Sequence, residues 1–117
     1  MKKLDLTAGN ITARLEICEA TTLMGLRRGQ LAAEAGNDDN PLIWFARRFM
    51  YPDLLACTNG EIEDKPVEEL TFDEFLALPD QITDAWLEAA YEVNPHWQPR
   101  LPEPAEQEKK RSKLTAG

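Results

Sequence analysis

The segment TFDEFLALPDQITDAWLEAAYEVNPHW, residues 71–97, constrains the fold most, because it contains two amphipathic helices with clear start and stop signals. Thr71 and Glu74 have capping-box spacing, and the intervening residues supply an apolar side. Pro79 suits the first turn of a second helix, where its missing N–H costs nothing. These signals predict helices over residues 71–78 and 79–93.

The second predicted helix has two faces of opposite character. At 100° per residue its apolar side chains fall on one arc, which predicts a core face. The members of this arc are Ile82, Ala85, Trp86, Ala89, Ala90 and Val93. Carboxylates four residues apart form a ladder on the other side, namely Asp80, Asp84, Glu88 and Glu92. We expect this candidate acidic surface to be solvated, with contact to a basic partner as the alternative.

The negative charge of the chain is concentrated in one part. The net charge is −8, and residues 53–92 hold 12 acidic groups against 1 basic group. Nucleic-acid binding depends mainly on Lys and Arg that neutralise phosphates, so we expect no nucleic-acid partner. A length of 117 residues corresponds to one domain with a single core.

The sequence favours a cytoplasmic protein with no membrane partner. Two lysines near the N-terminus are not followed by the apolar segment of a secretory signal. No run approaches the roughly 20 apolar residues of a membrane helix. Cys18 and Cys57 are therefore expected to stay reduced and to behave as small buried hydrophobes.

The N-terminal third predicts a β segment followed by a helix. Apolar and polar residues alternate on both sides of the turn signal Gly9-Asn10, which indicates a short hairpin or strand pair within residues 1–17. A threonine N-cap and Gly36 bound a helix over residues 21–35. Gly25 and Gly29 inside it each cost about 1 kcal/mol relative to alanine.

Asn40-Pro41 is a strong helix start and predicts a helix over residues 41–57. The predicted core arc of this helix contains Leu42, Ile43, Phe45, Ala46, Phe49 and Met50. On its other side, Trp44 and Tyr51 are seven residues apart and should lie nearly one above the other. Trp, Tyr and Arg are the residue types enriched in binding hot spots. The candidate partner-binding residues are Trp44, Arg47, Arg48 and Tyr51. Coverage of this side by a neighbouring helix is the alternative explanation.

The remaining segments predict irregular structure. Asn59-Gly60 is a turn signal, and residues 61–69 form an acidic connection broken by a proline. Residues 98–117 are proline-rich and polar, so we expect a disordered tail, with a basic cluster at Lys109, Lys110, Arg111 and Lys113. The expected fold is therefore mainly α: one compact helical domain over residues 1–97, with about four helices and a short N-terminal β-hairpin.

No motif indicates catalysis. His96 is the only histidine, and nothing in the spacing places it beside a nucleophile. The cysteines and this histidine do not form a zinc pattern, the acidic loop lacks a calcium-hand pattern, and phosphate-binding glycine loops are absent from the sequence. We therefore expect no enzyme, no cofactor and no metal site.

The segments NPLIWFARRFMYPDLLACT and LTFDEFLALPDQITDAWLEAAYEVNPHWQP resemble the short tail assembly chaperones of long-tailed bacteriophages and prophages. The shared layout is a helix ending in an aromatic-rich YPDLL turn, an acidic loop, and two helices followed by a proline-rich polar tail. The resemblance implies binding to the tape measure protein and assistance in tail tube assembly, without catalysis. It also implies action in the host cytoplasm, absence from the mature virion, and a longer frameshifted form of the same chain.

Two other interactions are compatible with the residues. A homo-oligomer is one. The other belongs to a different functional class, an acidic phage-encoded inhibitor that mimics DNA and binds a host nucleic-acid-binding protein. In that case the ladder at residues 80–92 and the acids of residues 61–74 would act as phosphate surrogates, and the helical spacing of about 6 Å in the ladder is near that of phosphates along a strand. Binding by such a mimic would depend strongly on salt.

Overall fold

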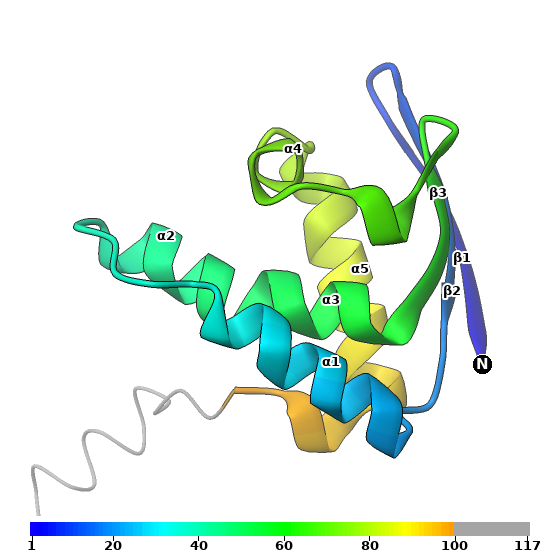
Figure 1. The fold of residues 1–117 in the computed structure, drawn as a ribbon. Coiled ribbons are helices and arrows are strands. Elements are labelled where there is room, and N and C mark those ends of the chain that lie inside the picture. Colours follow the sequence, from blue (N-terminus) through cyan, green and yellow to red (C-terminus); the bar gives the residue numbers. More distant parts are fainter. Residues whose placement is uncertain (100–117) are drawn as a thin grey trace, which may run out of the picture.

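A computed structural model describes residues 1–99. They form a four-stranded antiparallel sheet with helices packed on one face (Figure 1). The strands are β1 (Lys2–Ala8), β2 (Ile11–Ile17), β3 (Thr58–Ile62) and β4 (Lys65–Pro66), in the order β1-β2-β3-β4. The expected mainly α fold is therefore wrong, because the protein is mixed α/β. The basic cluster at residues 109–113 and most of the predicted tail lie outside the described residues.

The first two strands form the hairpin that the alternating pattern predicts. Leu4 lies opposite Leu15, and the register runs from Lys2 with Ile17 to Ala8 with Ile11. Gly9 has φ +60° at the first central position of the turn, which suits a type II′ hairpin. Apolar residues of both strands face the helices and polar residues face solvent, as expected for an antiparallel sheet covered on one side.

The other two strands occupy the segment that was expected to be irregular. The sequence TNGEIEDKP contains glycine, proline and several acids and lacks an alternating apolar pattern, so its own β propensity is low. Pairing with β2, from Ala13 with Ile62 to Ile17 with Thr58, imposes the strand conformation. Glu63 and Asp64 both have positive φ, the geometry of a two-residue type I′ hairpin turn. Tertiary pairing therefore overrides local preference here.

The helices cover one face of this sheet. Their bounds are α1 (Thr22–Ala33), α4 (Phe72–Leu76) and α5 (Asp80–Val93), with short 3₁₀ turns η2 (Val67–Glu69) and η3 (Pro95–Trp97). The capping box at Thr71 and Glu74 is present in both directions. Helix α5 buries Ile82, Trp86, Ala89 and Ala90, and the Trp86 indole donates to Thr58 Oγ1 at 2.9 Å. The predicted core face of α5 is confirmed for these residues.

The helix predicted over residues 41–57 is one rod with three parts, α2 (Pro41–Phe45), η1 (Ala46–Met50) and α3 (Tyr51–Cys57). The middle part is a π-helix, in which Tyr51 donates its backbone N–H to Ala46 O. Pro52 follows it, and in a regular α-helix the proline ring would collide with the carbonyl of Arg48. The wider π turn relieves this collision, so the rod continues through Pro52 into the buried α3.

Candidate functional site

The strongest candidate for a binding surface is an aromatic cluster on the first half of this rod, formed by Trp44, Phe45 and Phe49. Phe49 is its centre: its ring lies 5.0 Å from that of Phe45 and 6.0 Å from that of Trp44, the latter edge to face. All three side chains are half-buried and lie outside the main hydrophobic core. They therefore pack on one another at the surface.

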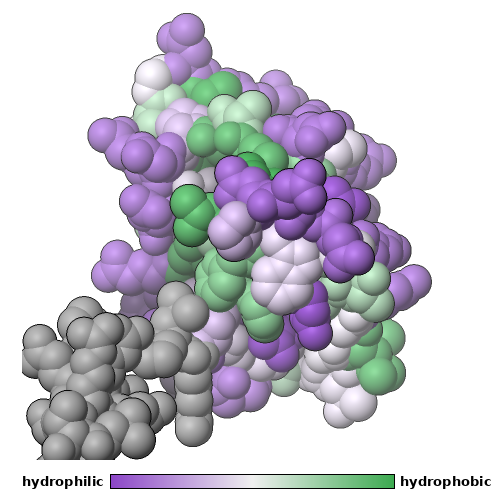
Figure 2. Space-filling model, turned by 90° about the vertical axis from the view of Figure 1, so that its left-hand side faces the viewer, coloured by the Kyte–Doolittle hydropathy of each residue, from purple (hydrophilic) through white to green (hydrophobic). Residues whose placement is uncertain are grey.

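The surroundings of the aromatic cluster leave it open to a partner. Figure 1 shows α2 at the end of the molecule farthest from the sheet. Leu42 is 79% exposed, and no residue of α2 is buried. In the view toward this end, apolar side chains gather in the centre of a largely hydrophilic face (Figure 2). An apolar area with a polar rim is typical of a protein-binding surface.

Two contacts hold the aromatic cluster in place. The Trp44 indole N–H donates to the backbone carbonyl of Gly36 at 3.0 Å, which ties the helix to the loop before it. The Arg48 guanidinium lies 5.1 Å from the centre of the Phe49 ring, close enough for a cation–π interaction. A partner would therefore meet preorganised aromatic rings with a positive charge beside them.

The structure divides the four predicted partner-binding residues into two pairs. Trp44 belongs to the half-buried aromatic cluster, and Arg48 lies beside it. Arg47 and Tyr51 turn toward α4: the Arg47 guanidinium lies 5.0 Å from the Phe72 ring centre, and the Tyr51 ring packs 5.7 Å from that of Phe75. The Tyr51 hydroxyl donates to the carbonyl of Leu70, and burial raises the pKa of this phenol.

The π turn explains why these four residues do not share a face. Each residue of a π turn advances by less than 100°, so Trp44 and Tyr51 no longer lie one above the other. The predicted core arc is confirmed only in part: Ala46 is buried and Ile43 and Met50 pack against the core, whereas Leu42 is exposed. Phe45 and Phe49, expected in the core, belong to the surface cluster instead. A proline six residues after Ala46 was the only sequence signal for this change.

The acidic ladder on α5 is exposed along its whole length at Asp80, Asp84, Glu88 and Glu92. Within the described residues, Lys2 on β1 forms an ion pair with Glu92 at 2.5 Å. The ladder lies on a different helix from the aromatic cluster.

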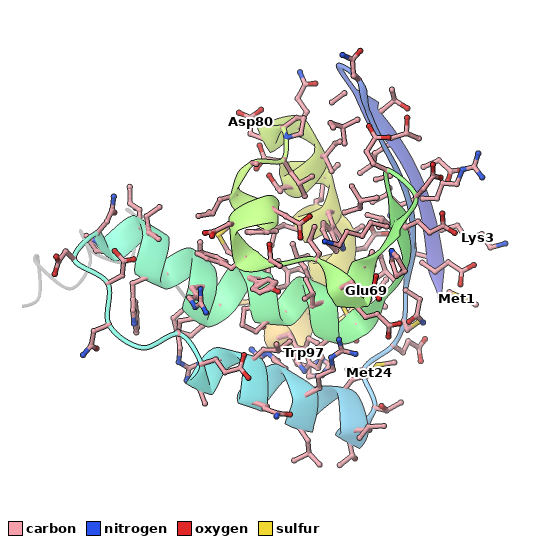
Figure 3. The ribbon with its side chains drawn as sticks, turned by 45° about the horizontal axis from the view of Figure 1, so that its top comes forward. Met1, Lys3, Met24, Glu69, Asp80 and Trp97 are labelled. Carbon is pink, nitrogen blue, oxygen red and sulfur yellow. The ribbon has the colours of Figure 1, made fainter. Side chains whose placement is uncertain are left out.

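A buried polar network joins four elements and was not predicted. Asp53 on α3 is 1% exposed and accepts from Arg28 Nε on α1 at 2.5 Å and from the Tyr91 hydroxyl on α5 at 2.8 Å. Arg28 Nη2 also donates to the carbonyl of Trp97 at 3.1 Å, and the guanidinium stacks on that ring. Figure 3 shows Trp97 against α1. Burial raises the pKa of Asp53, while Arg28 and Tyr91 oppose this shift.

The thiols have structural contacts. Cys57 is buried and donates Sγ–H to the carbonyl of Asp53 at 3.2 Å, and burial raises the pKa of this thiol.

A groove of about 300 Å³ lies between α1 and β3, with Arg27 and Glu68 as its only charged lining residues. Within residues 1–99, no group of three His, Cys, Asp or Glu side chains is arranged to hold a metal ion.

None of the helices in the described region is long and apolar enough to cross a membrane. Comparison with known proteins finds no matching family model, no matching curated protein and no matching solved structure.

Proposed function

We propose that this chain is a phage tail assembly chaperone that binds an apolar helical segment of the tape measure protein through the aromatic cluster. The observation that carries the proposal is the placement of Trp44, Phe45 and Phe49 on the surface, outside the core. These three large aromatic rings stay partly exposed, and a helical client that covers them would remove their remaining apolar surface from water. The sequence resemblance to tail assembly chaperones supplies the identity of that client.

The charges of the protein suit this role. Arg48 beside the aromatic cluster selects a client helix that carries an acidic residue next to its apolar stripe. The exposed acids of α5 keep a complex with an aggregation-prone client in solution. The protein acts in the cytoplasm of the bacterial host, assists assembly of tail tube subunits, and leaves the finished tail. It requires neither a catalytic step nor a cofactor, and a frameshifted longer form of the chain is a further partner.

The test is capture of a tape measure fragment from the same phage or prophage by the double variant Phe45→Ala, Phe49→Ala. Truncating two central aromatic contacts should weaken binding at least about tenfold, because such residues dominate interface energetics. Titration calorimetry gives the affinity, and light scattering shows whether the client stays soluble. The matched control is Leu23→Ala, Leu26→Ala, which removes two exposed leucines from α1.

Equal affinities for the parent chain and the phenylalanine variant would refute the proposed surface. The dependence of binding affinity on salt concentration distinguishes this function from the DNA-mimic alternative. Capture through apolar rings should change little with ionic strength, whereas binding through the acidic ladder should fall steeply as salt rises. Loss of capture in the variant Asp84→Asn, Glu88→Gln with the phenylalanines intact would place the client contact on the acidic ladder and refute the aromatic surface.

A further inference from the structure

The two edges of the sheet differ in how they are protected. Strand β4 is only two residues long and contains Pro66, and short strands and prolines block further pairing. At the other edge, β1 is seven residues long and contains no proline. Within residues 1–99 the sheet ends at β1, with no further strand beyond it. This edge is a template for another strand.

The hydrogen bonds of β2 show which groups of β1 point to that edge. Cys18 N–H donates to Cys57 O at 2.8 Å and Glu63 N–H donates to Thr12 O at 3.0 Å, so the even-numbered residues of β2 bond to β3. Because bonding directions alternate along a strand, the odd-numbered residues of β2 bond to β1. The register pairs them with the even-numbered residues of β1. The N–H and C=O groups of residues 3, 5 and 7 therefore point outward.

We propose that β1 pairs antiparallel with β1 of a second copy of this chain, joining two four-stranded sheets into one sheet of eight strands. The two-fold axis passes beside Leu4, so that Leu4 faces Leu4 of the second copy. Lys3 then faces Asp5 of the second copy, and Asp5 faces its Lys3. This register uses the outward N–H and C=O groups of both strands and overlaps them over residues 1–7.

Charge selects this register over its neighbours. The next registers that keep the interstrand hydrogen bonds are shifted by two residues. They place Lys3 opposite Lys3, or Asp5 opposite Asp5, and like charges directly opposite are destabilising. Both side chains are exposed on the solvent face of the sheet. Figure 3 shows Lys3 pointing away from the helices at the outer side of β1. Only the proposed register puts opposite charges together on both sides of the axis.

The charge pattern of the sheet itself continues through the proposed contact. Asp5 lies opposite Arg14, which lies opposite Glu61, and Lys3 lies opposite Glu16. A row across the dimer therefore reads Glu61, Arg14 and Asp5 of one copy, then Lys3 and Glu16 of the other. Its signs alternate without a break. On the other face Leu4 and Leu6 are half-exposed, and pairing would cover Leu4 with its counterpart.

The experiment is sedimentation equilibrium of the full chain over a micromolar concentration series, with any affinity tag placed at the C-terminus, away from β1. One strand pair buries less area than a standard stable interface of roughly 1,600 Å², so a reversible dimer is expected. Asp5→Lys sets lysine against Lys3 at two symmetry-related places and should weaken dimerisation about tenfold. The exchange Lys3→Asp, Asp5→Lys restores opposite charges across the axis and should restore the dimer. Thermal unfolding followed by circular dichroism checks that each variant is folded.

Cysteine cross-linking tests the register of the β1–β1 pair independently. In a Cys18→Ser background, Leu4→Cys places two thiols opposite each other at a non-hydrogen-bonded pair, where Cα atoms are about 4.5 Å apart. Mild oxidation should join this variant faster than Lys3→Cys or Asp5→Cys. A monomeric parent chain at every concentration would overturn the proposal, as would fastest cross-linking at position 3 or 5.

Discussion

At the scale of single residues, Gly60 is the only glycine within residues 1–99 at which an added Cβ would meet another atom within 4 Å. Its φ is +124°, and a Cβ built there would lie 2.1 Å from the carbonyl oxygen of Arg14 on the paired strand. Since that oxygen belongs to the backbone of β2, it cannot move aside without disturbing the sheet. Asn59-Gly60 resembled a turn signal in the sequence, yet the glycine permits close approach within a strand.

The same substitution should therefore have opposite effects at two glycines. Gly60→Ala should lower the free energy of unfolding by about 2–4 kcal/mol, through a backbone clash and a strained φ. Gly25→Ala in α1 should raise it by up to about 1 kcal/mol, because a Cβ there meets no atom within 4 Å and alanine favours the helix. Urea unfolding followed by tryptophan fluorescence measures both. Changes of the same sign would contradict this account.

Among the elements, the five-residue helix α4 depends on Glu74. The Lys65 ammonium lies 2.6 Å from Glu74 Oε1, and the backbone N–H of Thr71 donates to the same oxygen at 3.0 Å. These interactions, with Lys65 the larger cause, lower the pKa of Glu74 from 4.5 to about 2. So short a helix has little stability of its own, which makes its cap and this contact to β4 important.

The shifted pKa predicts a pH dependence. Below pH 4.5 the unfolded chain binds a proton at Glu74 before the folded chain does, so the stabilisation by Glu74 is complete above pH 4.5 and is lost as pH falls toward 2. Glu74→Gln should flatten the dependence of stability on pH in that window. Chemical denaturation at a series of pH values measures it, with Asp73→Asn in the same helix as the control. If the free energy of unfolding of Glu74→Gln fell between pH 4.5 and 2 as steeply as that of the parent chain, Glu74 would not contribute to the pH dependence.

At the scale of the whole molecule, the network around Asp53 joins elements that are far apart in the sequence. Helix α1 buries only Ala32, whereas α5 buries four residues. Met24 and Leu31 of α1 pack partly buried against the core, and the contacts of Arg28 with Asp53 and Trp97 add polar anchors to this attachment. Removing Arg28, whose side chain is 32% exposed, would leave the buried Asp53 carboxylate without its positive partner and with only the Tyr91 hydroxyl as a donor, which is destabilising.

Arg28→Ala should accordingly loosen α1 more than the rest of the protein. Amide hydrogen exchange followed by mass spectrometry should show the rates of α1 rising by a larger factor than those of α5, because local opening follows local contacts. Arg27→Ala is the matched control, since Arg27 is the adjacent, exposed arginine of the same helix. Equal acceleration in α1 and α5 would indicate a global effect and contradict a specific anchor.

The sequence by itself determined the features that arise from neighbours along the chain. The capping box at Thr71, the Asn40-Pro41 helix start, the first hairpin and most of the core face of α5 follow from spacing over a few residues. Their energies come from local hydrogen bonds and from the periodicity of the backbone, which a sequence pattern displays directly.

The tertiary structure alone decided which surfaces meet. Strand β3 forms because β2 offers it a ladder, and Asp53 is buried because Arg28 and Tyr91 converge on it from other helices. The π turn before Pro52 rotates the two halves of one rod against each other, which moves Phe45 and Phe49 to the surface and Tyr51 inward. These outcomes depend on contacts between residues far apart in sequence, and local periodicity carries no information about such contacts.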